Sequence, residues 1–325
     1  MWTADSILET FVFPFAISLA TLSVFLTALI PVLWIERKLA ARLQGRVGPY
    51  EVGSPHGYLQ PIADVLKLFS KADMIPTQAD RLLFLFAPIW TGTCALWGVA
   101  LIPFAPGLAA FRSDLSLVFL LAVASLPGLG QMAAGWASAN KYALVSALRV
   151  VGQIAAFEIP LVAGAITPAI VYGSLDLNTL TEAQPAVGFL FGHPLGIPSF
   201  LLFLVGMLAE GNRTPFDIAE AESELIAGVT IEYSGMRFAL FYIGEYGSLF
   251  LFGLLACVLW FGGFRGPFVP GPHWLLLKGF AFFCFVTILR WSFLRFRIDQ
   301  FLKISWSGFV PASFLLVLLA VWWVG

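Results

Sequence analysis

The chain has 325 residues, of which 59% are hydrophobic and only 11% are charged, and its formal net charge is −1. Soluble domains carry about 25% charged residues, so this composition excludes an ordinary soluble fold. The mean hydropathy is +0.89, and the ionisable residues lie almost entirely between long apolar runs rather than within them. This segregation is typical of an integral membrane protein and not of a nucleic-acid-binding protein.

Membrane spans are predicted wherever about 20 apolar residues follow one another, because a helix of that length crosses a hydrocarbon core of about 30 Å. Eight windows qualify, at residues 11–35, 82–104, 115–137, 144–172, 196–212, 238–262, 274–296 and 304–324. The fourth is too long for an upright span and contains Pro160 and Pro168, which predicts a tilt or a kink. We therefore expect an all-α integral membrane protein of about eight transmembrane helices, forming one helical domain over residues 1–325.

Charges outside the spans predict the orientation of the chain. Residues 1–10 carry Asp5 and Glu9 and no base, unlike a secretory signal peptide, so the first apolar run should remain as a span. The segments 36–81, 138–149, 211–237 and 290–303, on one side of the predicted spans, hold 15 of the 18 Lys and Arg. Only Arg112, Arg265 and Lys278 fall on the other side. By the positive-inside rule the basic side is the inner one, and both termini are expected on the outer side.

Motifs for a resident cofactor are missing from the sequence. Three cysteines and three histidines stand apart without ligand spacing: Cys94, Cys257, Cys284, His56, His193 and His273. There is also no Walker loop, no glycine-rich dinucleotide turn after a strand and no nucleophile elbow. We therefore expect this chain to bind no nucleotide, metal or iron–sulfur cluster, and its cysteines to act as small buried hydrophobes.

The first inner segment combines turns with an amphipathic helix. Residues 45–57 are rich in Gly and Pro, which argues against a continuous helix there. From Pro61 to Lys71 apolar residues recur at helical spacing, with Asp64 and Lys67 on the other face, which predicts an amphipathic helix at the membrane surface. The pattern also fits a plain solvated interfacial helix in which Asp64 and Lys67 form a local ion pair.

Carboxylates are concentrated in the third inner segment and also occur inside the spans. Six acids share 23 residues with a single base, Arg213: Glu210, Asp217, Glu220, Glu222, Glu224 and Glu232. Such a run is usually a solvated surface. If the acids instead line a poorly hydrated cavity, mutual repulsion raises some of their pKa values and lets them exchange protons. Arg149, Glu158 and Glu245 lie within spans, where a functional role is expected and a structural partner is the alternative.

Several long motifs then occur in a fixed order, namely WIERKLAARLQGRVGP, GYLQPIADVLKL, GWASANKYALVSALR, AEGNRTPFDIAEAESELIAG, IEYSGM, GEY and RFRIDQ. Over nearly the whole chain they resemble the H-type membrane subunit of respiratory complex I, a proton-pumping NADH:quinone oxidoreductase. The resemblance implies a subunit that forms a quinone chamber with the peripheral arm and couples quinone reduction to proton translocation. It implies quinone as substrate, no complete active site in this chain alone, and an energy-transducing membrane. For this chain we expect a bacterial or archaeal plasma membrane, with an organellar inner or thylakoid membrane as the alternative.

The resemblance also assigns residues by position. Residues implied to form the quinone tunnel and its mouth are Arg37, Arg46, Asp64, Lys67, Phe216, Arg290, Arg295 and Arg297. Carboxylates implied to couple protonation are Glu158, Glu210, Asp217, Glu220, Glu222, Glu224, Glu232 and Glu245. The implied partners are the peripheral quinone-site subunits, small membrane subunits, antiporter-like subunits and the lipid bilayer, and no nucleic acid.

Departures from the family pattern and rival functions leave some points open. Tyr50-Glu51 stands in place of Asn-Arg, Lys71-Ala72 in place of Lys-Glu, and Leu126-Pro127-Gly128 interrupts the third span, where it predicts a kink. Equivalent subunits of ferredoxin:plastoquinone, coenzyme F420 dehydrogenase or hydrogenase complexes remain alternatives, because the primary donor binds to other subunits. A free-standing proton or solute transporter should show an inverted repeat, and none is evident here. A purely structural anchor would not need Glu158 and Glu245.

Overall fold

The computed structural model describes residues 13–106, 108–111, 113–185, 187–219 and 222–325, and the long regular elements in these ranges are helices. The long helices are α2 (Phe13–Leu43), α4 (Arg81–Trp97), α5 (Ser116–Ala137), α6 (Lys141–Tyr172), α11 (Gly235–Trp260) and α12 (Pro272–Ser292). The last span joins α13 (Ile298–Ile304), a π-helical turn (Ser305–Phe309) and α14 (Val310–Val324). Seven described helices are long and apolar enough to cross a membrane, which confirms the predicted fold class.

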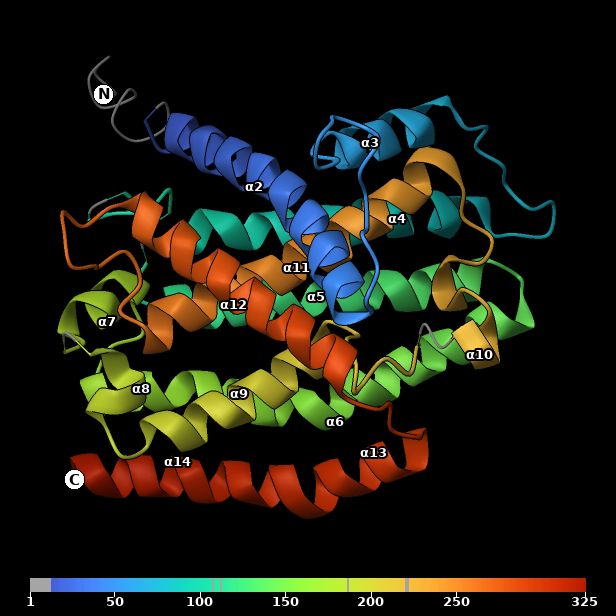
Figure 1. Cartoon of the computed structure of the whole chain (residues 1–325). Helices are drawn as coiled ribbons and strands as arrows, with labels where there is room; N and C mark the ends of the chain where they lie inside the picture. The colour runs from blue at the N-terminus through green and yellow to red at the C-terminus, as the bar shows by residue number, and fades with distance from the viewer. Residues whose placement is uncertain (1–12, 107, 112, 186, 220–221) are drawn as a thin grey trace, which may run out of the picture.

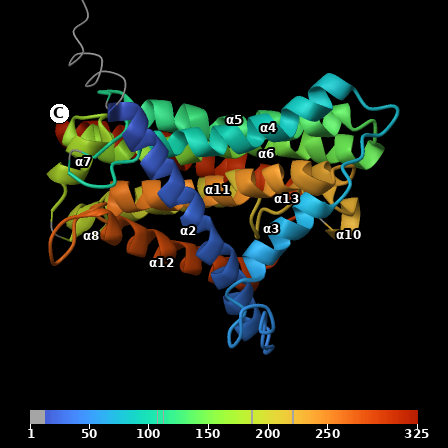
Figure 2. The ribbon, with the colours of Figure 1, turned by 90° about the horizontal axis from the view of Figure 1, so that it is seen from above.

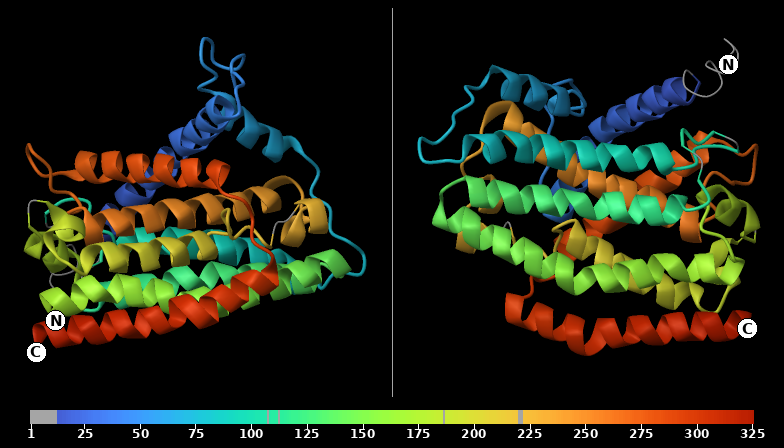
Figure 3. Two further views of the ribbon diagram at one scale, coloured as in Figure 1. Left: turned by 60° about the horizontal axis from the view of Figure 1, so that its bottom comes forward. Right: turned by 180° about the vertical axis from the view of Figure 1, so that it is seen from behind.

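The helices pack in rows. Seen from behind, α4, α5, α6 and α13–α14 follow one another side by side (Figure 3), and each packs on the next. α11 lies between this row and α12, as the view from above shows (Figure 2), and it also contacts α2. Of its most apolar stretch, 83% is buried, so α11 is the central helix of the described bundle. A charge on α11 is therefore enclosed on several sides by protein.

The connections gather at two ends of the bundle (Figure 1). The start of α2, the helices α7 (Leu177–Ala183) and α8 (Gly188–Gly192) and the C-terminus lie at one end, called here the α7–α8 end. The helices α3 (Gln60–Ser70) and α10 (Glu222–Leu225) lie toward the other, the α3–α10 end. The segments predicted to be inner run to the α3–α10 end. Residues 1–10 and Arg112 lie outside the described residues.

The fifth predicted span, 196–212, is shorter than expected. The structure has α9 (Gly196–Glu210), an apolar helix of 15 residues, which is about 22 Å long and does not reach across a hydrocarbon core. The helix ends at Gly211, and Asn212 takes a positive φ of 49°, a conformation that Asn tolerates better than most residues. The chain therefore turns within the bundle, and the residues after α9 lie among helices rather than at a surface.

The first inner segment differs from the prediction at one place. α2 continues beyond the predicted end at residue 35 to Leu43, so Glu36, Arg37 and Lys38 lie on a helix and not in a loop. The stretch from Glu36 to Leu43 contains no Gly or Pro and is rich in strong helix formers. The helix stops just before Gly45, whose φ is +71°. The predicted amphipathic helix is confirmed as α3, with Pro61 in its first turn.

The helix α6 runs unbroken through Pro160 and Pro168. Because Pro160 has no N–H, the carbonyl of Ala156 loses its partner within the helix. The hydroxyl of Ser305, the first residue of the π-helical turn, donates a hydrogen bond to that carbonyl. The irregular turn in the last span thus satisfies the group that proline frees in α6. The tilt or kink of α6, and the kink at Pro127 in α5, stay predictions.

Glycine sets the close approach of α6 and α9. A Cβ atom on Gly164 would lie 2.7 Å from both the backbone nitrogen of Phe203 and the carbonyl oxygen of Ser199. A Cβ atom on Gly206 would lie 2.5 Å from the Cβ of Leu161. Small residues let membrane helices approach closely enough for good packing, so this contact holds the short helix α9 in place.

Replacing Gly164 by Ala should lower the melting temperature of the purified protein in detergent. The new methyl group meets backbone atoms that cannot rotate away, and overpacking of this kind destabilises by about 1–3 kcal/mol. Gly152→Ala is the matched control on the same helix, because a Cβ there would meet nothing within 4 Å. Equal melting temperatures for the two variants would contradict the assigned α6–α9 contact.

Candidate functional site in a buried charge cluster

Four charged side chains from four separate segments meet inside the bundle: Glu36 of α2, Arg213 after α9, Glu245 of α11 and Arg290 of α12. The Nη2 atom of Arg213 lies 2.8 Å from Oε1 of Glu245, and its Nη1 atom lies 3.5 Å from Oε1 of Glu36. Arg290 pairs with the same oxygen of Glu36. The side chain of Arg213 is only 2% exposed, so this is a buried ionic network.

The ion pairs of the network join two arginines to two carboxylates. The guanidinium carbon of Arg213 also lies 4.5 Å from the ring centroid of Tyr246, a cation–π distance. Asp217 is near enough to interact electrostatically with Glu245. Removing one partner of a buried ion pair leaves the other charge uncompensated in a low-dielectric interior, which is strongly destabilising. A change of charge at one member should therefore change the electrostatic energy of the others.

Amide side chains of α5 and α6 hold the segment that carries Arg213. Asn212 Nδ2 donates to Gln131 Oε1 at 3.1 Å. Gln153 Nε2 donates to the carbonyls of Ala209 and Phe216, the latter at 2.9 Å. These bonds tie the end of α9 and the turn after it to α5 and α6. The position of Arg213 is thus fixed from both flanks.

Two cavities lie next to each other beside this network. The smaller has about 10 Å³, room for about one water molecule, and its lining includes both Glu210 and Glu245. The larger has about 210 Å³ and extends toward Thr230 and Tyr242. Gln131, Asn212 and Glu245 line both cavities. The lining of the smaller cavity thus brings two carboxylates to one small polar space.

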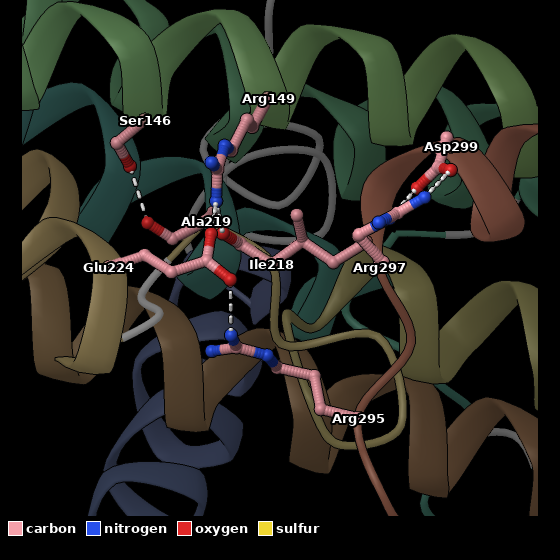
Figure 4. Close-up of polar contacts among 8 residues, drawn as sticks. All are labelled: Ser146, Arg149, Ile218, Ala219, Glu224, Arg295, Arg297 and Asp299. Carbon is pink, nitrogen blue, oxygen red and sulfur yellow. Dashed lines mark hydrogen bonds and ion pairs between the residues drawn. The ribbon is translucent and has the colours of Figure 1, made fainter.

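A second charged cluster joins α6, α10 and the segment before α13 (Figure 4). Glu224 accepts hydrogen bonds from Arg149 at 2.6 Å and from Arg295 at 2.7 Å, and Arg297 pairs with Asp299. A cavity of about 430 Å³ lies between these residues. The hydrogen bond from Arg149, assisted by the positive charges of Arg149 and Arg295, lowers the pKa of Glu224. Near neutral pH this favours a lasting ion pair over proton exchange at Glu224.

The tunnel residues predicted on α2 and α3 divide into paired and exposed groups. Arg37 pairs with Asp64 across the two helices, and Gln60 Nε2 also donates to Asp64 at 3.0 Å. Asp64 therefore pairs with a residue of α2 and not with Lys67, so the alternative of a local ion pair within α3 is wrong. Lys67 is exposed, and so is Arg46, which donates to Gln44 at 2.7 Å.

The remaining predicted residues lie apart from the network. Phe216 is buried in an aromatic core, with ring centroids 5.2 Å from Phe157 and 5.3 Å from Phe301. Glu158 lies on the exposed face of α6 and interacts electrostatically with Glu210. Glu232 accepts a hydrogen bond from Asn140 at 2.7 Å. Glu220 and the side chain of Glu222 lie outside the described residues.

Sequence reasoning therefore found Glu245 and Arg290 but left Glu36, Arg213 and Tyr246 out of the predicted site. The available signal for Arg213 was its position as the single base among six acids. Glu36 was hidden by the expectation that it lay in a loop, where a charge needs no partner.

Comparisons with known proteins agree with the resemblance read from the motifs. The family model for NADH dehydrogenase matches residues 16–321. The chain is 41% identical over 306 residues to the H-type subunit of NADH-quinone oxidoreductase from a Geobacillus species, covering 93% of this chain and 91% of that protein. The subunit of the same name from Chlorobium luteolum is 39% identical over 311 residues, which are 89% of this chain and 83% of that protein. The one from Rickettsia prowazekii is 41% identical over 286 residues, 86% of this chain and 84% of that protein. The chain therefore belongs to the NADH dehydrogenase family.

Proposed function

We propose that this chain is the quinone-chamber membrane subunit of a proton-translocating NADH:quinone oxidoreductase and couples quinone reduction to proton movement. The observation that carries the proposal is the buried ionic network of Glu36, Arg213, Glu245 and Arg290, beside a small cavity that both Glu245 and Glu210 line. The relatives are named as H-type subunits of NADH-quinone oxidoreductase, and these names supply the reaction and the other subunits as partners.

In this proposal the quinone lies along α2 and α3 and reaches a headgroup site completed by the peripheral subunits. The helix α3 exposes the apolar residues Ile62, Val65, Leu66 and Phe69, which suit an isoprenoid tail. Arg37 and Asp64 tie α3 to α2 at the mouth. Arg46, Lys67, Arg295 and Arg297 remain proposed contacts at this mouth, whereas the burial of Phe216 suits a supporting role.

The network would convert the charge of the quinone into a protonation change. Reduction to quinol takes up two electrons and two protons, so the charge near the site changes during each turnover. Arg290 is the most exposed member of the network, at 27%. A change in the charge of the quinone would first alter the ion pair of Arg290 with Glu36. Because buried charges interact strongly in a low-dielectric interior, the change would then reach Arg213, which contacts Glu36, and Glu245, which contacts Arg213.

From Glu245 the proposed path continues through the small cavity to Glu210 and by electrostatic coupling to Glu158. Glu158 lies on an exposed face of α6 in the chain alone, and a charge there at membrane depth calls for a partner. We place the neighbouring small membrane subunits and the antiporter-like subunits beyond it. Asp217 and Glu232 stay candidates for side branches, and Glu224 serves as an anchor.

We also propose that the α3–α10 end faces the inner side of an energy-transducing membrane, with both termini outside, because 15 of the 18 basic residues belong to the inner segments. A cysteine in place of Glu51, which is exposed, should then resist an impermeant maleimide in right-side-out vesicles. A cysteine in place of Val269, which is 77% exposed, should react within minutes. The reverse labelling pattern would invert the assigned orientation.

Purification of the intact complex through a tag on this chain tests the proposed function. We expect NADH-oxidising subunits with iron–sulfur clusters to co-purify, and the complex to reduce quinone with NADH. The isolated chain in liposomes should neither reduce quinone nor transport protons. Co-purification of a ferredoxin-oxidising or hydrogenase module would assign the chain to a related complex, and activity of the isolated chain would overturn the proposal.

A further inference from the structure

A large cavity opens at the α7–α8 end, and its described lining contains no member of either charge cluster. It has a volume of about 890 Å³ and lies between the α7–α8 connection, the turn after α11 and the start of α12. Its lining combines Arg265 and Lys278 with the apolar side chains of Val187, Trp274 and Leu277. The two cations are two of the three bases that the sequence assigns to this side.

Backbone carbonyls hold the side chains of Arg265 and Lys278 in place. Lys278 Nζ donates to the carbonyls of Phe261, Gly263 and Arg265 at 2.7, 2.9 and 2.6 Å. The bond to Phe261 caps the C-terminal end of α11, and the other two hold the turn that follows the helix. Arg265 Nη1 donates to the carbonyl of Gln184 at 2.9 Å. The turn is thus fixed to α12 and to the end of α7.

The two cations of this cavity are held by backbone carbonyls in the described part of the chain. Among the residues that the structure describes, neither Arg265 nor Lys278 forms an ion pair with a carboxylate. Lys278 directs its three donors to carbonyls, but Arg265 is exposed and uses one nitrogen for Gln184. A guanidinium held in this way presents its other N–H groups in a fork that fits phosphate oxygens.

An apolar stripe leads away from the cations along α12. Leu277, Ala281, Phe285 and Ile288 follow one another at helical spacing and are all exposed. From Leu277 to Ile288 the helix rises about 16 Å, which is about half of a 30 Å hydrocarbon core and therefore the depth of one leaflet. The small side chain of Ala281 leaves a dip in the stripe and lines the cavity.

We propose that this cavity binds one anionic phospholipid of the leaflet at the α7–α8 end. The phosphate would lie on Arg265, the glycerol region beside Trp274, and one acyl chain along the stripe on α12. Trp is common at the level of lipid headgroups, and a base at that level attracts anionic lipid. A base that pairs with no described carboxylate, above an apolar stripe as deep as one leaflet, favours a lipid over a protein partner.

A photoreactive lipid tests the site on the intact purified complex. Phosphatidylglycerol with a diazirine in its acyl chain is added in mixed micelles, illuminated, and mapped by mass spectrometry of the digested chain. We expect labelling on α12 in the wild type and in Arg265→Lys, which keeps the charge. Arg265→Gln should reduce it at least about fivefold. Ala281→Trp, which fills the dip without changing charge, should reduce it as well, with quinone reductase activity unchanged in all three variants.

Competition separates the possible occupants. Unlabelled phosphatidylglycerol should suppress labelling, whereas phosphatidylcholine and inorganic phosphate at the same concentration should not. Equal labelling of Arg265→Gln and the wild type would overturn the proposal. So would equal competition by phosphatidylcholine, which indicates ordinary annular lipid. Cross-links from this cavity to another subunit of the complex in place of lipid would assign it to a protein partner and overturn the proposal too.

Discussion

Replacing Arg213 by Met should prevent stable incorporation of the chain into its complex. The substitution leaves Glu36 and Glu245 buried with only Arg290 to balance them. Breaking a buried ion pair by removing one partner is destabilising by about 3–5 kcal/mol, a large part of the stability of a folded domain. The measurement is the amount of chain in assembled complex on a native gel, together with its melting temperature.

Two further variants separate charge balance from loss of a large side chain. The double variant Arg213→Met with Glu245→Gln removes one charge of each sign, so it should assemble better than Arg213→Met alone. Arg42→Met is the control, because Arg42 is an exposed base in the last turn of α2. If Arg213→Met assembles as well as Arg42→Met, the network does not stabilise the chain.

Replacing Glu210 by Gln should leave the complex assembled but lower its quinone reductase activity by on the order of a hundredfold, a typical effect of losing a positioned proton-transfer group. Glu210 lines the small cavity with Glu245. Among the described residues, none forms an ion pair with Glu210. The amide has nearly the same shape as the carboxyl group, so packing should be preserved. The measurement is the NADH:quinone rate per assembled complex, beside the rate with an artificial acceptor that bypasses the quinone.

The matched control is Glu182→Gln, which neutralises an exposed carboxylate on α7 at the opposite end of the bundle. Its quinone reductase activity should equal that of the wild type. A normal rate in Glu210→Gln would remove this carboxylate from the proposed path. A parallel loss of artificial-acceptor activity would instead indicate damage to the whole complex.

Much of the fold could be predicted because apolar length and helical spacing act locally. The helix α3 began and ended within a residue of its prediction, since its pattern and Pro61 lie within its own sequence. The predicted end of α2 was wrong because hydropathy falls at Glu36, whereas helix propensity stays high as far as Leu43. The end of α9 depends on the turn at Asn212, which amides of distant helices stabilise, and no local pattern reveals that contact.

The site was predictable only in part for a similar reason. Depth within a span singled out Glu245, and motif resemblance added Arg290. The pairing of both with Glu36 and Arg213 joins residues far apart in the chain, such as Arg290 and Glu36. The structure also distinguishes among the acids of residues 210–232, which look alike in the sequence. Glu224 is held by Arg149 and Arg295, whereas Glu210 faces a cavity.

Coupling between quinone reduction and proton movement is tested most directly by measuring both rates on one sample of Glu158→Gln complex in liposomes. Subunit content and artificial-acceptor activity are checked first, so that assembly is not in question. Because Glu158 interacts electrostatically with Glu210 at the end of the proposed path, we expect NADH-driven quinone reduction and proton pumping to fall together. Full quinone reduction with full pumping in this variant would contradict the proposed path.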